Sequence, residues 1–222
     1  VTTHSPSVIN KLKISNVIAF SGNDAVSLSS FGEELNDYLR KRPNFDILRL
    51  IYADKLILVE GPSEEMLIRT YINLDRNNLS GIEVISVAQK GYKTFLDIWL
   101  RVNKNNKNKK IGIVRDFDDQ ENAQKEHEEY RSKHPFITIE TTTLYTLEDD
   151  IAHNSNNTNS IAEYFSIPLD ADHSEDADMI SKFLKDDKTG GMLSLCDAMS
   201  REASPLVIEL PSHIIKVLEA LK

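Results

Sequence analysis

The chain has 222 residues, 40% hydrophobic and 27% charged, with a net charge of −9. This size allows one or two domains with a sizeable core. No apolar run approaches the roughly 18 residues of a membrane span, and no signal peptide is visible. We therefore expect a cytoplasmic protein without a membrane partner. The negative charge argues against holding nucleic acid by bulk positive potential, although clustered carboxylates can meet phosphates through bound metal ions.

Cysteine usage is minimal, since Cys196 is the only one. A single cysteine excludes an intramolecular disulfide and a thiolate metal cluster. Free cysteines are among the most buried residue types, so we expect an inert thiol in the core.

The first 50 residues resemble the end of one unit. A strand is expected at Val17–Phe20, closed by the turn signal SGND, and helices are expected at Phe31–Lys41 and Phe45–Tyr52. The opening VTTHSPSVIN has no initiator Met and reads as the interior of a larger protein.

From residue 54, apolar strand segments alternate with amphipathic helical segments. The expected strands are Leu56–Glu60, Ile82–Val87, Ile111–Val114 and Phe136–Glu140. The expected helices are Pro62–Leu74, Lys93–Val102 and Ala123–Lys133. This order predicts an α/β fold with a parallel four-stranded sheet flanked by helices and joined by right-handed crossovers.

The regular alternation ends after the fourth strand. The polar, low-complexity stretch His153–Ser160 is expected to be a loop. Helices are expected at Leu147–Ala152, Ile161–Phe165, Asp178–Leu184, Met192–Met199 and Pro211–Leu221. The sequence therefore predicts a helical carboxy-terminal extension.

The stretch ADKLILVEGPSEE carries the first pair of candidate acids. An unbroken apolar run suits a strand buried on both faces, and Pro62 suits the first position of a helix. Glu60 then stands at a strand end and Glu64 one helical turn later, at the sheet edge where ligands bind. The alternative is that Glu64 only favours the helix dipole and Glu65 is solvated surface.

Two further acidic clusters follow later strands. Asp116 and Asp118 come directly after the third strand and suit a divalent metal, although a helix-capping Asp pair is the alternative. Glu148 lies in TLEDD, after the fourth strand, where a capped helix start is the alternative. We expect Asp149 and Asp150 to lie on the surface.

The three acidic clusters are more informative as a set than separately. The carboxyl ends of parallel strands lie along one edge, so Glu60, Asp116 and Glu148 should converge on one pocket. Carboxylates repel one another and are costly to gather without a cation between them. Such a cluster can hold two metal ions about 4 Å apart, the arrangement that hydrolyses phosphodiesters.

These motifs resemble a known family. VEGPSE (Val59–Glu64) followed by DFD (Asp116–Asp118) resembles the Toprim domain of topoisomerases, primases and some nucleases. The spacing, Glu64 and the later LED (Leu147–Asp149) are most similar to the OLD (overcoming lysogenisation defect) family of nucleases. Thr3–Pro6 resembles the switch-histidine segment that closes the ABC-type ATPase of such proteins, which would place His4 at an ATPase site. No GxxxxGKS/T phosphate loop is present.

The resemblance implies three parts of the chain. Residues 1–50 would be the remnant of an ABC-type ATPase domain, residues 51–152 the Toprim catalytic domain, and residues 153–222 the helical carboxy-terminal part of the nuclease region. The full-length protein would be an ATPase-associated homo-oligomer that acts in phage defence and binds ATP.

The resemblance also implies a mechanism, in which a metal-dependent DNA endonuclease (a nickase) uses two Mg²⁺ or Mn²⁺ ions. Glu60 and Glu64, with Glu148 assisting, would bind one ion, and Asp116 and Asp118 the other. The family also uses a lysine near the metals. Lys188 in DKTGGM is the candidate for that role, and Lys182 and Lys185 compete with it.

Other functions stay open. The basic loop Arg101–Lys110 could contact the DNA backbone or be simply solvated. Asp116 could instead be a phosphate-accepting nucleophile, as in DxD phosphatases or receiver domains. The chain could also be a non-catalytic dimerisation or regulatory module.

Overall fold

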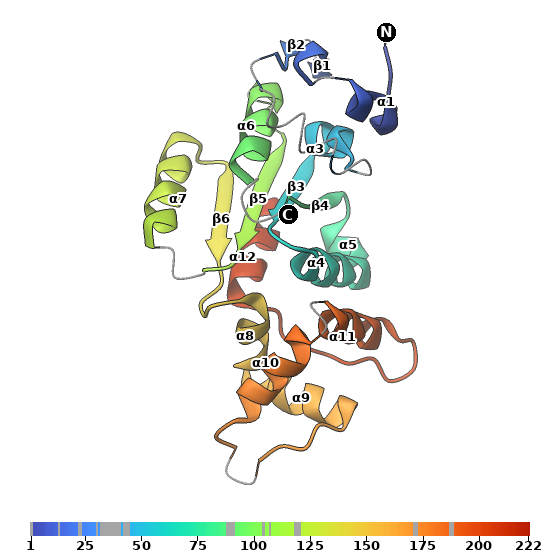
Figure 1. Ribbon diagram of the computed structural model, residues 1–222, viewed down its shortest axis with the longest axis vertical. Coiled ribbons are helices and arrows are strands. Elements are labelled where there is room, and N and C mark those ends of the chain that lie inside the picture. The colour runs from blue at the N-terminus through green and yellow to red at the C-terminus, as the bar shows by residue number, and fades with distance from the viewer. Residues whose placement is uncertain are drawn as a thin grey trace.

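A sheet of four parallel strands, in the order β4-β3-β5-β6, forms the centre of the molecule (Figure 1). The computed structural model describes residues 2–12, 14–21, 24–29, 31, 41, 45–87, 92–103, 105–106, 108–117, 121–170, 173–186 and 189–222. The strands are β3 (Lys55–Val59), β4 (Ile82–Ser86), β5 (Lys110–Arg115) and β6 (Ile137–Thr141). The predicted α/β fold is confirmed, and each strand lies within one residue of its expected bounds.

Helices cover both faces of the sheet. The connecting helices are α3 (Ile47–Tyr52), α4 (Pro62–Leu74), α5 (Arg76–Leu79), α6 (Tyr92–Asn103) and α7 (Glu121–Lys133). Because side chains alternate along a strand, Leu56 and Leu58 pack with α3 and α6, where Trp99 is fully buried. Ile57 and Val59 point the other way and pack with α4 and the carboxy-terminal helices.

The last helix, α12 (Ser212–Leu221), lies against the sheet because Gly112 has no side chain. A Cβ atom at Gly112 would come within 2.4 Å of Cγ1 of Val217. The helix contacts β3, β5 and β6. The expected helix Pro211–Leu221 is thus part of the core.

The remaining carboxy-terminal helices extend beyond the carboxyl ends of the strands (Figure 1). They are α8 (Leu147–Ala152), α9 (Ser155–Phe165), α10 (Asp176–Lys185) and α11 (Gly190–Ser200). Their buried side chains join the core that covers one face of the sheet, and Cys196 is buried there as expected.

The expectation of a loop at His153–Ser160 is wrong, because most of that stretch lies in α9. The Asn154 carboxamide caps α9 by accepting a hydrogen bond from the N–H of Asn157. The side chain of Asn157 is itself buried, and it bonds both the carbonyl and the N–H of Glu209. The asparagines of this stretch, which the sequence places in a loop, therefore cap a helix and form a buried polar bridge.

The amino-terminal part adds α1 (Pro6–Lys11), the 3-10 turn η1 (Ile14–Asn16) and a hairpin of β1 (Ile18–Ser21) and β2 (Asp24–Ser27). The strand β2 was not expected from the sequence. Most of the expected helix Phe31–Lys41 lies outside the described residues, whereas α3 is confirmed. In the described part of the chain, no helix combines the length and the hydropathy that a bilayer crossing requires.

Candidate active site

Glu60 stands immediately after the central strand β3. In the sheet register, Val59 pairs with both Ser86 and Val114, so three strands end at one level. The Glu60 side chain is nevertheless 6% exposed, and its Oε1 accepts a hydrogen bond from Nε of Arg115 at 2.6 Å. A buried carboxylate thus lies at the sheet edge where ligands of α/β proteins bind.

Glu64 lies in the first turn of α4 and turns back toward Glu60. Its Oε2 accepts the backbone N–H of Gly61 at 3.1 Å, and a Cβ at Gly61 would lie only 2.9 Å from that oxygen. Burial raises the pKa of Glu64 to about 7, and the charges of Glu148 and Glu60 add to that rise. Glu64 is therefore poorly solvated and lies near enough to Glu60 and Glu148 for their charges to repel.

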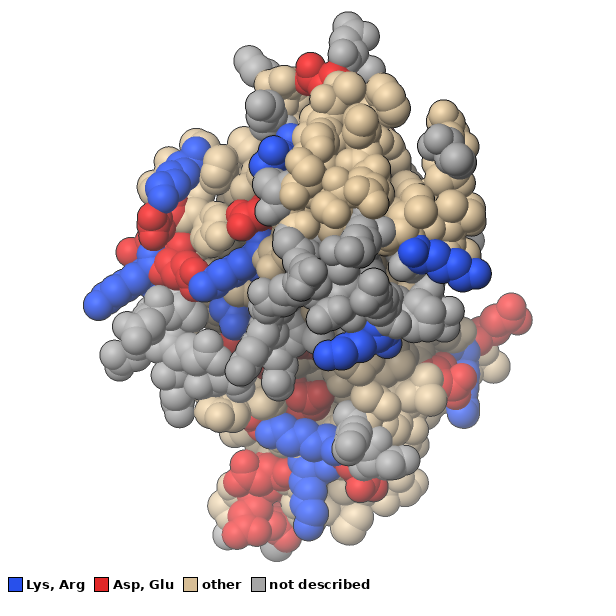
Figure 2. Space-filling view, turned by 45° about the horizontal axis from the view of Figure 1, so that its top comes forward, with Lys and Arg blue, Asp and Glu red and all other residues tan. Residues whose placement is uncertain are grey.

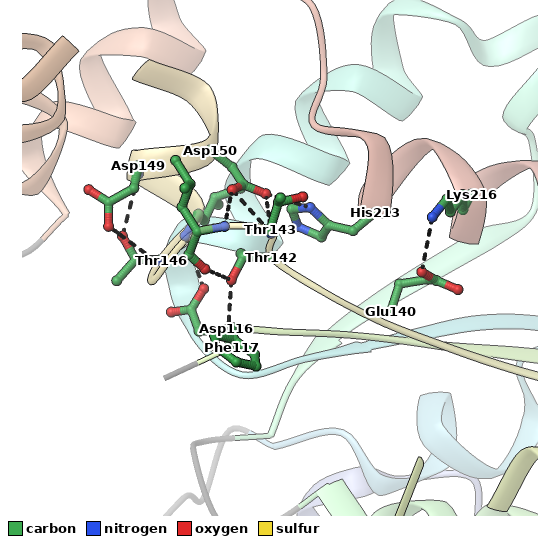
Figure 3. A network of polar contacts seen from close by, with 12 residues as sticks. Asp116, Phe117, Glu140, Thr142, Thr143, Thr146, Asp149, Asp150, His213 and Lys216 are labelled. Carbon is green, nitrogen blue, oxygen red and sulfur yellow. Dashed lines mark hydrogen bonds and ion pairs between the residues drawn. The ribbon is translucent and has the colours of Figure 1, made fainter. Parts of the chain in front are cut away.

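Asp116 follows β5 and points toward the start of α8. Its Oδ1 accepts the N–H of Leu147 at 3.0 Å, so the carboxylate sits at a helix amino terminus. Thr142, just past β6, accepts the N–H of Phe117 through Oγ1 at 2.8 Å and so fixes the chain beyond Asp116 (Figure 3). Asp118 lies outside the described residues.

The structure therefore brings the strand-end and helix-start acids Glu60, Glu64, Asp116 and Glu148 to one edge of the sheet. Carboxylate oxygens are the donors that Mg²⁺ and Mn²⁺ prefer. A carboxylate whose pKa is raised by burial, and further by like charges, gains from a cation, so the donor types fit such ions. Among the described residues, however, no three acids, histidines or cysteines come close enough to hold an ion.

Asp149 is not on the surface, contrary to expectation. Its Oδ1 accepts hydrogen bonds from Ser181 and Lys185 of α10, and its Oδ2 accepts from Thr146 (Figure 3). Burial acts to raise the pKa of Asp149, but these hydrogen bonds outweigh it and hold the pKa below its usual value. Asp149 therefore fastens α8 to α10, beside Glu148.

The Asp150 side chain is only 6% exposed, so the surface expectation is wrong for this residue too. Its carboxylate accepts the N–H groups of Thr143 and Leu144, and Oδ2 lies 3.1 Å from Nδ1 of His213 in α12 (Figure 3). Burial acts to raise the pKa of Asp150, but the His213 and backbone hydrogen bonds outweigh it and lower the pKa. No sequence pattern linked His213 to this place.

A second group that the sequence did not suggest surrounds Arg115. Besides its bond to Glu60, Nη1 of Arg115 lies 3.1 Å from Nε2 of His127, and the guanidinium carbon lies 4.5 Å from the ring centre of Tyr92. Burial, followed by the charge of Arg115, lowers the pKa of His127 to about 4. The position of Arg115 directly before the DFD motif was the only available signal.

The candidate lysines have different environments. Lys188, the preferred candidate, lies outside the described residues. Lys185 pairs with Asp149, one residue from Glu148, whereas Lys182 is exposed on α10. Lys185 is thus the described lysine with a direct connection to the acidic edge.

The described part of the basic stretch, residues 101–103, 105–106 and 108–110, lies at the opposite end of the sheet from the site. It leads into the amino end of β5, whereas the acids follow the carboxyl ends, roughly 20 Å away for a strand of this length. Lys109 is buried and donates to the carbonyls of Ile51 and Tyr52. This lysine supports the fold and is not free to contact DNA at the acidic edge.

Residues 51–118 match the family model for the "Overcoming lysogenization defect protein-like, TOPRIM domain". Two structures of the C-terminal region of the Xanthomonas campestris pv. campestris OLD protein, one phased with iodine and one with platinum, are similar to this chain. They share 15% and 16% identity and cover 77% and 78% of this chain, with 94% of each of those chains covered. The TM-score is 0.48 for both. No curated protein matches the sequence.

The parallel sheet, the acids at its edge and the family match agree on one class: residues 51–118 are similar to a Toprim domain. Within that class, the family model that matches is of the OLD-like type, as the VEGPSE and DFD motifs predicted. The match supports a nuclease-type Toprim function in general terms.

Proposed function

We propose that the chain is the nuclease part of an OLD-like protein and nicks DNA by metal-dependent phosphodiester hydrolysis. The observation that carries the proposal is the buried Glu64 carboxylate beside Glu60 and Glu148, at the edge where Asp116 also lies. This gathering of like charges, within an OLD-like Toprim match, supports a cation site there.

The proposed roles divide the acids between two ions. Glu60 and Glu64, with Glu148 assisting, would hold one Mg²⁺ or Mn²⁺, and Asp116 with Asp118 would hold the other. Two bound ions supply a more acidic attacking water and a stabilised leaving oxygen. Lys188 remains the proposed residue that neutralises charge on the reacting phosphate.

The surface supports a metal-mediated approach of DNA. Figure 2 shows basic and acidic side chains interspersed on the face that it presents. Together with the net charge of −9, this mixed surface favours binding in which metal ions, and not a basic surface, meet the phosphates.

The proposed parts of the longer protein follow the expected boundaries. Residues 1–50 would end an ABC-type ATPase domain, with His4 in its switch segment, and residues 153–222 would complete the nuclease region. ATP binding, self-association and a role in phage defence would belong to the full-length protein.

The test is nicking of supercoiled plasmid with Mg²⁺ or Mn²⁺, on variants chosen from the contacts. Glu60→Gln keeps an acceptor for Arg115, and Asp116→Asn keeps one for Leu147, so both should fold and lose nicking. Glu65→Gln is the matched control, because Glu65 bonds Arg69 and the N–H of Ser86. Persistent nicking in both Glu60→Gln and Asp116→Asn would refute the assignment.

The same variants separate the alternatives. Loss of phosphoryl transfer in Asp116→Asn alone, with Glu60→Gln and Glu64→Gln active, would indicate a phosphatase with Asp116 as nucleophile. A folded wild-type chain that binds no Mn²⁺ in calorimetry would indicate a non-catalytic module.

A further inference from the structure

Arg115 is a buried cation bonded to a proposed metal ligand, and three neighbours, Glu60, His127 and Tyr92, hold it in place. Its side chain is 6% exposed, as is that of Glu60. The residue continues the register in which Val114 pairs with Val59, so Arg115 and Glu60 face each other across two adjacent strands. The next residue in the chain, Asp116, is itself a proposed ligand.

Each polar group around Arg115 has a defined contact. Nε of Arg115 donates to Oε1 of Glu60 at 2.6 Å, while Nη1 faces Nε2 of His127 at 3.1 Å. His127 is 2% exposed, and the Tyr92 ring packs on the guanidinium. Tyr92 is anchored in turn by its hydroxyl, 3.4 Å from Oε2 of Glu126 on α7.

This geometry fixes the orientation of a carboxylate. A planar guanidinium held by a ring and an imidazole has little freedom, so the oxygen bonded to Nε is fixed too. Carboxylates that bind metals are themselves hydrogen-bonded by outer groups, which set their orientation. A buried arginine that only balanced the charge of Glu60 would not need the imidazole and the ring.

We propose that Arg115, held by His127 and Tyr92, is a positioning residue that fixes the orientation of the Glu60 carboxylate through Oε1 for binding of the divalent ion. This inference rests on the proposed function, since it takes Glu60 as a ligand. It assigns the His127–Tyr92 pair to the site, although both residues lie on helices that cover the sheet and neither is a ligand.

The test measures Mn²⁺ binding by calorimetry and the Mn²⁺ concentration that gives half-maximal nicking. Arg115→Met and His127→Leu should each weaken Mn²⁺ binding 10- to 100-fold, the range seen when groups that hold a ligand are removed. Arg115→Lys keeps the positive charge but lacks the forked guanidinium group, so it should recover part of the lost Mn²⁺ affinity. The KM for plasmid should stay unchanged in all three.

The matched control is Arg49→Met. Arg49 also pairs with Glu83, in a half-exposed contact near the amino end of β4, away from the acidic edge. This variant should bind Mn²⁺ as the wild type does. Should Arg115→Met fail to fold, His127→Leu carries the test, because it leaves the Arg115–Glu60 pair in place.

The possible outcomes are distinct. Unchanged Mn²⁺ affinity in folded Arg115→Met or His127→Leu overturns the positioning role and leaves a structural ion pair. Tighter Mn²⁺ binding in Arg115→Met also overturns it, because Arg115 would then compete with the ion. A wild-type chain that binds no Mn²⁺ and nicks no DNA refutes the proposed function itself.

Discussion

Oδ1 of Asp116 accepts the backbone N–H of Leu147 at 3.0 Å, although the two residues are 31 positions apart. The bond joins the end of β5 to the first residue of α8. Because Glu148 follows Leu147 directly, the same bond sets where that carboxylate lies relative to Asp116. Two of the three acidic clusters are thus mechanically linked before any ion binds.

The first prediction concerns pH. Glu64 has a pKa of about 7 when folded, against an ordinary value of 4.5. At pH values between these two pKa values, Glu64 is ionised in the unfolded chain and protonated in the folded chain. The stabilising contribution, on the order of 3 kcal/mol, is therefore complete at low pH and lost as pH rises through about 7 in metal-free protein.

Urea unfolding at about pH 5 and about pH 8 with chelator present measures this loss. Glu64→Gln should remove most of the difference, whereas Glu83→Gln on β4 should keep it. An equal pH dependence in the wild type and Glu64→Gln would contradict the prediction.

The second prediction compares two adjacent asparagines in α9. Asn157 is 1% exposed and bonds the carbonyl of Ile151 and both backbone groups of Glu209. Asn157→Ala should cost about 2–4 kcal/mol of unfolding free energy, because it leaves buried backbone groups unsatisfied. Asn156→Ala, which loses one exposed bond to Glu209, should stay within about 0.5 kcal/mol. Equal effects at both positions would argue against the buried bridge.

The third prediction concerns the packing of α12 against the sheet. Gly112→Ala should destabilise the fold by about 1–3 kcal/mol, since its Cβ would overlap Cγ1 of Val217. Val217→Ala removes that atom, so the double variant should be more stable than the sum of the single effects predicts. Strict additivity in denaturant titrations would show that the helix is not packed on Gly112.

The fourth prediction separates the lysines. Lys188→Met should abolish nicking and keep Mn²⁺ affinity, if that lysine neutralises the reacting phosphate. Lys182→Met should change neither quantity, because Lys182 is exposed. Lys185→Met should lower stability through its lost bond to Asp149. Full nicking by Lys188→Met would transfer the role to another lysine.

The sequence predicted the sheet well because the signals were local. An apolar run such as LILV, closed by Gly61 and Pro62, allows few structures other than a buried strand followed by a helix. The acids at Glu60, Asp116 and Glu148 could then be placed by topology alone, because parallel strands share a carboxyl edge.

What could not be predicted depends on distant contacts. One partner of Asn157, Glu209, lies 52 residues ahead, so local composition alone favoured a loop. The burial of Asp150 follows from His213 in the last helix, and the environment of Arg115 comes from α6 and α7. No periodicity or motif in the sequence encodes such long-range contacts.

The position of α12 also has a consequence for synthesis. The helix packs on β5, whose last residue is made about 100 residues earlier, so the part of the sheet under α12 stays uncovered while the intervening segments emerge. During that interval the nascent chain would leave apolar β5 residues such as Val114 uncovered, and partly folded states of this kind tend to aggregate. Chaperone demand during translation should therefore be greatest before Val217 appears.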